Sequence, residues 1–234
     1  FFASKFEKFV LKARSWTGSK AMHFHIVTLF PESFSSYLGT SILSRALEKK
    51  KIKVFYYNPR DFTADKHRRV DHRPYGGGPG MVLEAEAVIK AIAKAKGRRK
   101  KVKIIFFSPT GGLFTNTYAE NLVKKYTHVI FVCGRYEGVD ARVKKVFPMD
   151  DISIGPYILT GGELAALVIM DTTTRRIPGV IGTYESLEEE RIASSDVYTR
   201  PEILFYKGKK YKVPKVLLSG HHKNIDVWRA KREK

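Results

Sequence analysis

Three glycine-containing segments are the strongest candidates for a binding site in this sequence. They are Ser108–Gly112, Cys133–Gly138 and Ile154–Gly162, and each follows a predicted strand. A single glycine at a strand end is usually only a turn. Three such segments at successive strand ends would surround one crevice with exposed backbone N–H and C=O groups, which suits a flat heterocycle. Apolar side chains that could sandwich such a ring are Phe106, Ile154, Tyr157 and Leu159.

A fourth segment, Asp71–Met81, is rich in glycine and proline. Its two prolines and Tyr75 restrict the chain, and nearby basic side chains are suited to phosphate contacts. These basic residues are Lys66, Arg68, Arg69 and Arg73. We interpret the segment as a shaped loop for a nucleotide, with a flexible connector as the alternative.

The common nucleotide and hydrolase motifs are absent. The sequence has no P-loop motif, no HExxH and no GxSxG, and Gly76–Met81 lacks the last glycine of GxGxxG. A P-loop NTPase and an ordinary Rossmann dehydrogenase are therefore not supported. Two pairs of histidines are candidate metal ligands: His23 and His25 on one predicted strand, and His221 and His222 in a loop. Histidines in such positions more often have a structural role than bind a metal. We therefore expect no structural metal.

The net charge indicates a polyanionic partner. The 234 residues include 43 Lys and Arg against 23 Asp and Glu, which gives a formal charge of +20. Nucleic acid is favoured over anionic lipid, because no single helix concentrates the charge on an amphipathic face. A generic solubilising surface is the alternative.

Cysteine usage and hydropathy limit the setting of the protein. A single cysteine, Cys133, excludes an intramolecular disulfide framework and fits a reducing, cytoplasmic location. The longest apolar stretch, Gly155–Met170, is interrupted by Thr160 and Glu163, so we expect no transmembrane helix and no membrane association.

The elements that must position these segments alternate between strands and helices. We predict strands near Phe24–Phe30, Ile52–Tyr57, Val102–Phe107, Val129–Cys133 and Ile152, and helices near Ser33–Lys49, Leu83–Ala95, Thr117–Tyr126, Asp140–Val146, Gly162–Arg175 and Lys223–Lys231. Strands rich in Val, Ile and Phe between helices indicate an α/β fold with a parallel sheet covered on both faces. Ligands of such sheets bind at the carboxyl ends of the strands, where the glycines lie.

Changes in composition suggest four parts. Residues 1–21 read as an N-terminal extension or a segment added upstream of Met22, and residues 22–182 as the catalytic domain. Residues 183–196 are acidic in an otherwise basic chain and read as an interdomain linker, whereas residues 197–234 read as a small helical domain that is truncated.

Five motifs carry a family resemblance that spans about Met22 to Trp228. RPYGGGPGM, SPTG, CGRYEGVDAR, ISIGPYILTGGEL and RRIPGV, in this order, resemble the bacterial tRNA (guanine-N1)-methyltransferases that modify guanine 37 beside the anticodon. The resemblance implies a deep trefoil knot in the α/β domain, S-adenosylmethionine as methyl donor, a homodimer with a shared active site, and a helical C-terminal domain that helps to bind tRNA. These properties follow from the resemblance and not from composition or spacing.

The resemblance also implies site residues. The cofactor site would comprise Pro109, Gly111, Gly134, Tyr136, Glu137, Ile154, Gly155, Pro156, Tyr157, Ile158, Leu159, Gly161 and Gly162. Pro156, where the family often has an acid, and Ala165, where a proline is common, depart from the pattern.

The catalytic pair implied by the resemblance is a linker acid and an arginine. Neutral guanine carries a proton on N1, so methylation there requires a general base, and a cation near O6 would stabilise the developing charge. By register the arginine is Arg175 and the acid is Glu190, a glutamate where the family has aspartate. Glu189 is the alternative base. A third possibility is that the whole acidic segment is a solvated linker without a catalytic role.

Two other functions stay open at this point. One is another knotted RNA methyltransferase that acts on ribose or ribosomal RNA, which would not require the pair of Arg175 and a linker acid. The other is a non-catalytic basic RNA-binding protein, which would explain the charge but not three pocket-forming glycine segments.

Overall fold

The structure is a computed structural model that describes residues 21–181 and 196–230. The chain divides into two compact units, Phe1–Ile181 and Gly182–Lys234, which are described separately. In the described ranges, no helix has both the length and the apolar composition that a membrane crossing requires.

A five-stranded parallel sheet forms the centre of the first unit. Its strands are β1 (Met22–Val27), β2 (Ile52–Tyr57), β5 (Val102–Leu113), β6 (His128–Val132) and β7 (Asp150–Ser153), in the order β2-β1-β6-β5-β7. Neighbouring strands run parallel throughout, with β1 between β2 and β6. The predicted α/β class with a parallel sheet is confirmed.

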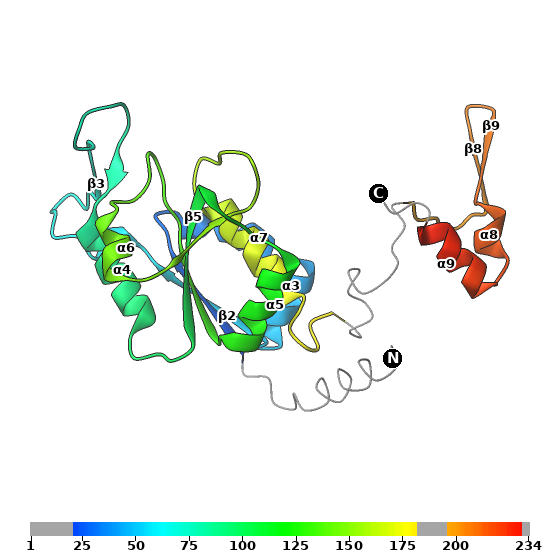
Figure 1. The fold of residues 1–234 in the computed structure, drawn as a ribbon, viewed down its shortest axis with the longest axis horizontal. Coiled ribbons are helices and arrows are strands. Elements are labelled where there is room, and N and C mark those ends of the chain that lie inside the picture. Colours follow the sequence, from blue (N-terminus) through cyan, green and yellow to red (C-terminus); the bar gives the residue numbers. More distant parts are fainter. Residues whose placement is uncertain (1–20, 182–195, 231–234) are drawn as a thin grey trace. The chain divides into compact units, whose positions relative to one another are not determined.

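Helices cover both faces of this sheet (Figure 1). One face carries α3 (Ser41–Glu48), α5 (Asn116–Lys125) and α7 (Glu163–Thr174), which pack on Phe24, Ile105 and Phe131. The other carries α4 (Ala85–Lys96) and α6 (Arg142–Val146), which pack on Ile104, Ile130 and Val132. Burying apolar side chains on both faces fixes the sheet in the middle layer.

Some boundaries differ from the sequence-based expectation. The helix expected over Ser33–Lys49 is divided into a 3₁₀ turn η1 (Pro31–Phe34), α2 (Ser35–Leu38) and α3, because Gly39 and Thr40 interrupt it. β5 continues past Phe107 to Leu113, with a register shift against β7 between Phe107 and Gly112. A short 3₁₀ turn, η2 (Pro59–Asp61), and the ladder of β3 (Asp71–His72) with β4 (Val82–Leu83) were not predicted.

The described part of the second unit contains a hairpin besides helices. The antiparallel strands β8 (Ile203–Tyr206) and β9 (Lys209–Lys212) precede α8 (Lys215–Leu218) and α9 (His222–Ala230). The helix predicted near Lys223–Lys231 corresponds to α9, whereas the hairpin was not expected. All of β9 is exposed.

Candidate active site

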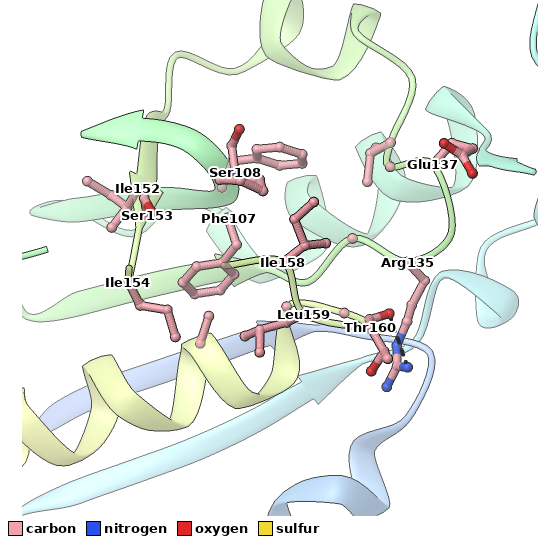
Figure 2. Close-up of a pocket in the computed structure, with 18 of the residues that line it drawn as sticks. Phe107, Ser108, Arg135, Glu137, Ile152, Ser153, Ile154, Ile158, Leu159 and Thr160 are labelled. Carbon is pink, nitrogen blue, oxygen red and sulfur yellow. Dashed lines mark hydrogen bonds between the residues drawn. The ribbon is translucent and has the colours of Figure 1, made fainter. Parts of the chain in front are cut away.

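A pocket of about 430 Å³ lies at the carboxyl ends of β5, β6 and β7 (Figure 2). Its walls come from the three glycine-containing segments that follow these strands. This is the edge of a parallel sheet at which ligands bind, and the volume is within the range of small-molecule sites. The strand-end segments singled out in the sequence thus converge on one cavity.

Most of the predicted cofactor residues line this pocket. They are Pro109, Gly134, Tyr136, Glu137, Ile154, Gly155, Tyr157, Ile158, Leu159, Gly161 and Gly162. Gly111 and Pro156 are not among the lining residues. Gly111 instead lies where β5 meets β7, and a Cβ there would come within 2.6 Å of the backbone of Asp151. Gly111 therefore allows two strands to approach closely, which is a structural reason for a glycine at this position.

Ser108, Arg135, Gly138 and Thr160 also line the pocket and lie inside the three candidate segments, although they are not among the expected cofactor residues. Other lining residues lie outside these segments: Phe107, Val139, Ala141, Lys144, Ile152, Ser153 and Ala165. Among them, Lys144 places Nζ 4.2 Å from the ring centre of Phe106 and 2.6 Å from Asp151 Oδ2. The pocket is therefore mostly apolar, with a small number of charged groups at its wall.

An ion pair between the buried Glu163 and the partly buried Arg135 supports the loop Ile154–Gly162. Arg135 Nε lies 3.0 Å from Oε2 of Glu163, whose side chain is 5% exposed. The hydroxyl of Thr28 donates to Glu163 Oε1 at 2.7 Å, and Arg135 also lies over the ring of Phe30 at 4.5 Å. Figure 2 shows Arg135 beside Thr160, whose carbonyl oxygen accepts from Arg135 Nη1 at 3.4 Å. Because a buried charge needs partners, this network holds the loop against β1 and β6.

Close backbone packing fixes the end of the same loop. The N–H of Gly162 donates to the carbonyl oxygen of Gly134 at 3.1 Å, and Arg135 and Gly161 form an isolated antiparallel bridge. A Cβ at Gly162 would come within 2.7 Å of Cys133 Cα. Only glycine permits this approach between the end of β6 and the start of α7.

The loop after β6 is joined to the glycine-rich segment Asp71–Met81. The N–H of Glu137 donates to the carbonyl oxygen of Met81 at 3.0 Å, and a Cβ at Gly80 would meet the Glu137 side chain at 2.5 Å. Tyr136 has a φ of 57°, a left-handed conformation that is costly for a residue with a side chain and is often found at functional sites. The glycine-rich segment therefore packs against one wall of the pocket.

Of the two predicted catalytic residues, only Arg175 lies in the described part of the chain, and it is not in the pocket. Arg175 is the C-cap of α7 and does not line the cavity, whereas Gly162 at the other end of α7 does. With a rise of about 1.5 Å per residue, these two ends of α7 are roughly 20 Å apart. Glu190, like its alternative Glu189, lies outside the described residues.

The buried thiol of Cys133 is not a nucleophile here. Burial, and then the charge of Glu163, raise the pKa of Cys133 well above its usual value. Since the thiolate is the reactive form, the one cysteine of the chain stays protonated at neutral pH. The arrangement suits binding and orientation of a planar ligand rather than covalent thiol catalysis.

Comparisons with known proteins identify the family of this chain. Residues 22–234 match the family model described as tRNA (Guanine-1)-methyltransferase TrmD. A tRNA (guanine-N(1)-)-methyltransferase of Buchnera aphidicola subsp. Acyrthosiphon pisum is 44% identical over 212 residues, which cover 89% of this chain and 88% of the relative. Relatives with the same description from Dictyoglomus turgidum and Carboxydothermus hydrogenoformans are 48% and 47% identical, over 88% and 90% of this chain and 82% of each relative.

Proposed function

Because this chain belongs to the tRNA (guanine-N1)-methyltransferase family and transfers a methyl group to N1 of guanine in tRNA, we propose that S-adenosylmethionine is the donor and guanine 37 the acceptor. The observation that supports the donor assignment is the convergence of three strand-end loops on one pocket. The family resemblance of the motifs supports the position of the guanine.

The pocket fits the adenosine part of such a donor. Phe106, Tyr157 and Leu159 offer apolar surface for a flat purine ring, and the glycines leave the backbone accessible beside it. The bound sulfonium compound would supply an electrophilic methyl group without a metal ion. The part of the protein is then to hold the donor and to exclude water from the reacting atoms.

Methylation of N1 also requires that the N1 proton leaves. In our proposal the carboxylate of Glu190 accepts this proton, and the guanidinium of Arg175 stabilises the negative charge that spreads towards O6. The longer side chain of glutamate shifts the carboxylate by about one bond relative to aspartate, while its ordinary pKa differs by less than about half a unit. The substitution therefore preserves the chemistry of the base.

A homodimer explains how Arg175 can reach a pocket. Because the length of α7 separates Arg175 from the pocket of its own chain, we infer that Arg175 acts in the pocket of a second chain. The outer face of α7 supports this arrangement, because Leu164 is 55% and Val168 38% exposed on a helix whose other faces are largely buried. A helix that is apolar on all sides is expected to be covered. Leu164 also borders the loop residues Leu159 and Thr160.

We propose the trefoil knot for the segment between β7 and α7. After the edge strand β7, this segment returns past the ends of β5 and β6, where Gly162 packs on Cys133 and bonds to Gly134, and α7 then packs beside α5. A segment that passes between neighbouring loops in this way is what the resemblance implies for the cofactor-binding knot.

The second unit is proposed to bind tRNA in the cytoplasm. Its hairpin presents exposed aromatic and basic side chains, which suit stacking and phosphate contacts. They are Phe205, Tyr206, Lys207, Lys209, Lys210, Tyr211 and Lys212. The acidic residues 183–196 would then act as the linker that carries the base to the guanine.

S-adenosylmethionine is expected to raise the melting temperature of the protein. At about 100 times its Kd a ligand stabilises the folded state by about 2.7 kcal/mol, which for this chain length corresponds to a rise of roughly 5–10 °C. ATP and NAD at the same concentration serve as controls, because they share the adenosine but lack the sulfonium side chain. Equal shifts with all three ligands, or none with the methyl donor, would contradict the donor assignment.

Gly162→Ala is expected to weaken donor binding by at least about tenfold, or 1.4 kcal/mol. The added methyl group would lie 2.7 Å from Cys133 Cα and 2.9 Å from Phe107 Cδ2, so the pocket wall must shift. Gly112→Ala is the matched control, since its nearest contact would be an ordinary 3.9 Å. Calorimetric titration with S-adenosylmethionine measures both variants, and similar affinities for the two would contradict this role of Gly162.

A further inference from the structure

Three histidines lie close together on the sheet, near the amino ends of two inner strands. His23 and His25 lie on β1, and His128 is the first residue of the neighbouring strand β6, directly paired with His23. Because alternate residues of a strand share a face, His23 and His25 point to the same side of the sheet. This cluster is at the amino ends of the strands, whereas the pocket is at their carboxyl ends.

The geometry of the cluster is close to that of a metal site. One ring nitrogen from each of the three histidines lies within 4.8 Å of the other two. His25 Nε2 and His128 Nδ1 are already 3.1 Å apart. Ligand nitrogens about 2.0–2.1 Å from a tetrahedral Zn²⁺ are separated by roughly 3.4 Å. A small rotation of His23 would therefore complete three corners of a tetrahedron.

Neighbouring side chains hold the buried member of the cluster in place. His25 Nδ1 is 3.0 Å from the hydroxyl oxygen of Tyr57, and the ring of Phe55 stacks on His25 at 5.1 Å. A hydrogen bond to the second ring nitrogen is the usual way in which proteins orient a metal-binding imidazole. His23 and His128 are only partly buried, so water can reach the fourth position.

The charge state of the cluster also suits a metal. Burial is the main cause that lowers the pKa of all three histidines, that of His25 to about 3. The imidazoles are thus neutral at pH 7, as metal ligands must be. Arg99 contributes to each shift and Lys53 to that of His23, so nearby positive charge opposes a cation and moderate affinity is expected.

We propose that His23, His25 and His128 bind a divalent metal ion such as Zn²⁺, with water as the fourth ligand. Imidazole ligands suit Zn²⁺, Cu²⁺ and Ni²⁺ and not Mg²⁺ or Ca²⁺. The ion would link β1 to β6 near the amino ends of these strands, whereas the pocket lies at the carboxyl ends of the sheet. This differs from the expectation of no structural metal, because His128 lies 103 positions from His25 and the sequence alone did not connect them.

The test uses the full chain, stripped of metal and titrated with Co²⁺ and Zn²⁺. We expect one equivalent of Co²⁺ to give the intense visible bands of a four-coordinate ion and Zn²⁺ to abolish them. His23→Gln and His128→Gln should each weaken binding about tenfold or more, and Tyr57→Phe by a similar factor. The double variant His221→Gln/His222→Gln is the matched control, because it removes two exposed histidines elsewhere and should bind as the unaltered protein does.

A second measurement does not depend on the variants folding. In the unaltered chain, Zn²⁺ should shift the imidazole NMR signals of three of the seven histidines. The proposal is overturned if the unaltered protein gives no four-coordinate Co²⁺ bands, if Zn²⁺ shifts other histidines instead, or if binding is lost in the His221 and His222 control and kept in His23→Gln.

Discussion

Glu190→Gln is expected to lower the rate of methyl transfer at saturating tRNA and donor by about 100- to 10,000-fold, the usual contribution of a general base. The amide of glutamine cannot accept the N1 proton of guanine, yet it keeps nearly the same size. Affinity for S-adenosylmethionine should not change, since the pocket is formed by the loops after β5, β6 and β7. Single-turnover kinetics with labelled donor measure the chemical step directly.

Glu189→Gln is the matched control for this prediction. It makes the same chemical change one position earlier in the acidic stretch, so it alters the charge of the linker equally. A near-normal rate for Glu189→Gln beside a large loss for Glu190→Gln would identify the base. The reverse pattern would transfer the role to Glu189, and full activity of both would remove the linker base from the mechanism.

Arg175→Gln is expected to reduce the rate by about 100- to 1,000-fold, as the loss of one group that stabilises a developing oxyanion does. The effect should appear in kcat, because the charge on O6 develops only as the N1 proton leaves. Arg176→Gln, which changes the residue that follows Arg175, is the control and should retain most of the activity. Equal losses in both variants would indicate a general effect on the end of α7 instead.

Mixed dimers show from which chain Arg175 acts. We expect a chain with Arg175→Gln to bind the donor normally, and a chain with Gly162→Ala to keep a functional Arg175. The assay uses a donor concentration near the Kd of the unaltered pocket, at which the weakened pocket of Gly162→Ala is mostly empty. If the arginine works across the dimer, random mixing of these two impaired chains restores roughly a quarter of the sites, because half of the dimers are mixed and each has one complete site. No recovery would contradict a site shared between two chains.

The main features of the fold follow from the sequence for a simple reason. Buried parallel strands such as Val129–Val132 are apolar on both faces, so they stand out from the amphipathic helices around them. The position of the pocket follows in turn, because glycines after parallel strands meet at one edge of the sheet. Phe106, Tyr157 and Leu159 were expected at this edge and line the pocket.

What the sequence did not indicate depends on contacts between distant residues. The support of the pocket loop joins Thr28, Arg135 and Glu163, which lie far apart in the chain, and no sequence pattern connects the three. The hairpin of β8 and β9 was missed because its connection, Lys207-Gly208, is a weaker turn signal than Asn-Gly and lies in a basic run. Arg175 and Glu190 were assigned from the family resemblance alone, and their roles stay predictions.

Methyl transfer from S-adenosylmethionine to N1 of guanine 37 can be followed with a pair of tRNA transcripts. The protein is incubated with labelled donor and two tRNA transcripts that differ only in carrying guanine or adenine at position 37, and the nucleosides are then identified after digestion. Our account predicts label in 1-methylguanosine from the first transcript and none from the second. Equal labelling of both transcripts, or label in a ribose or another base, would contradict it.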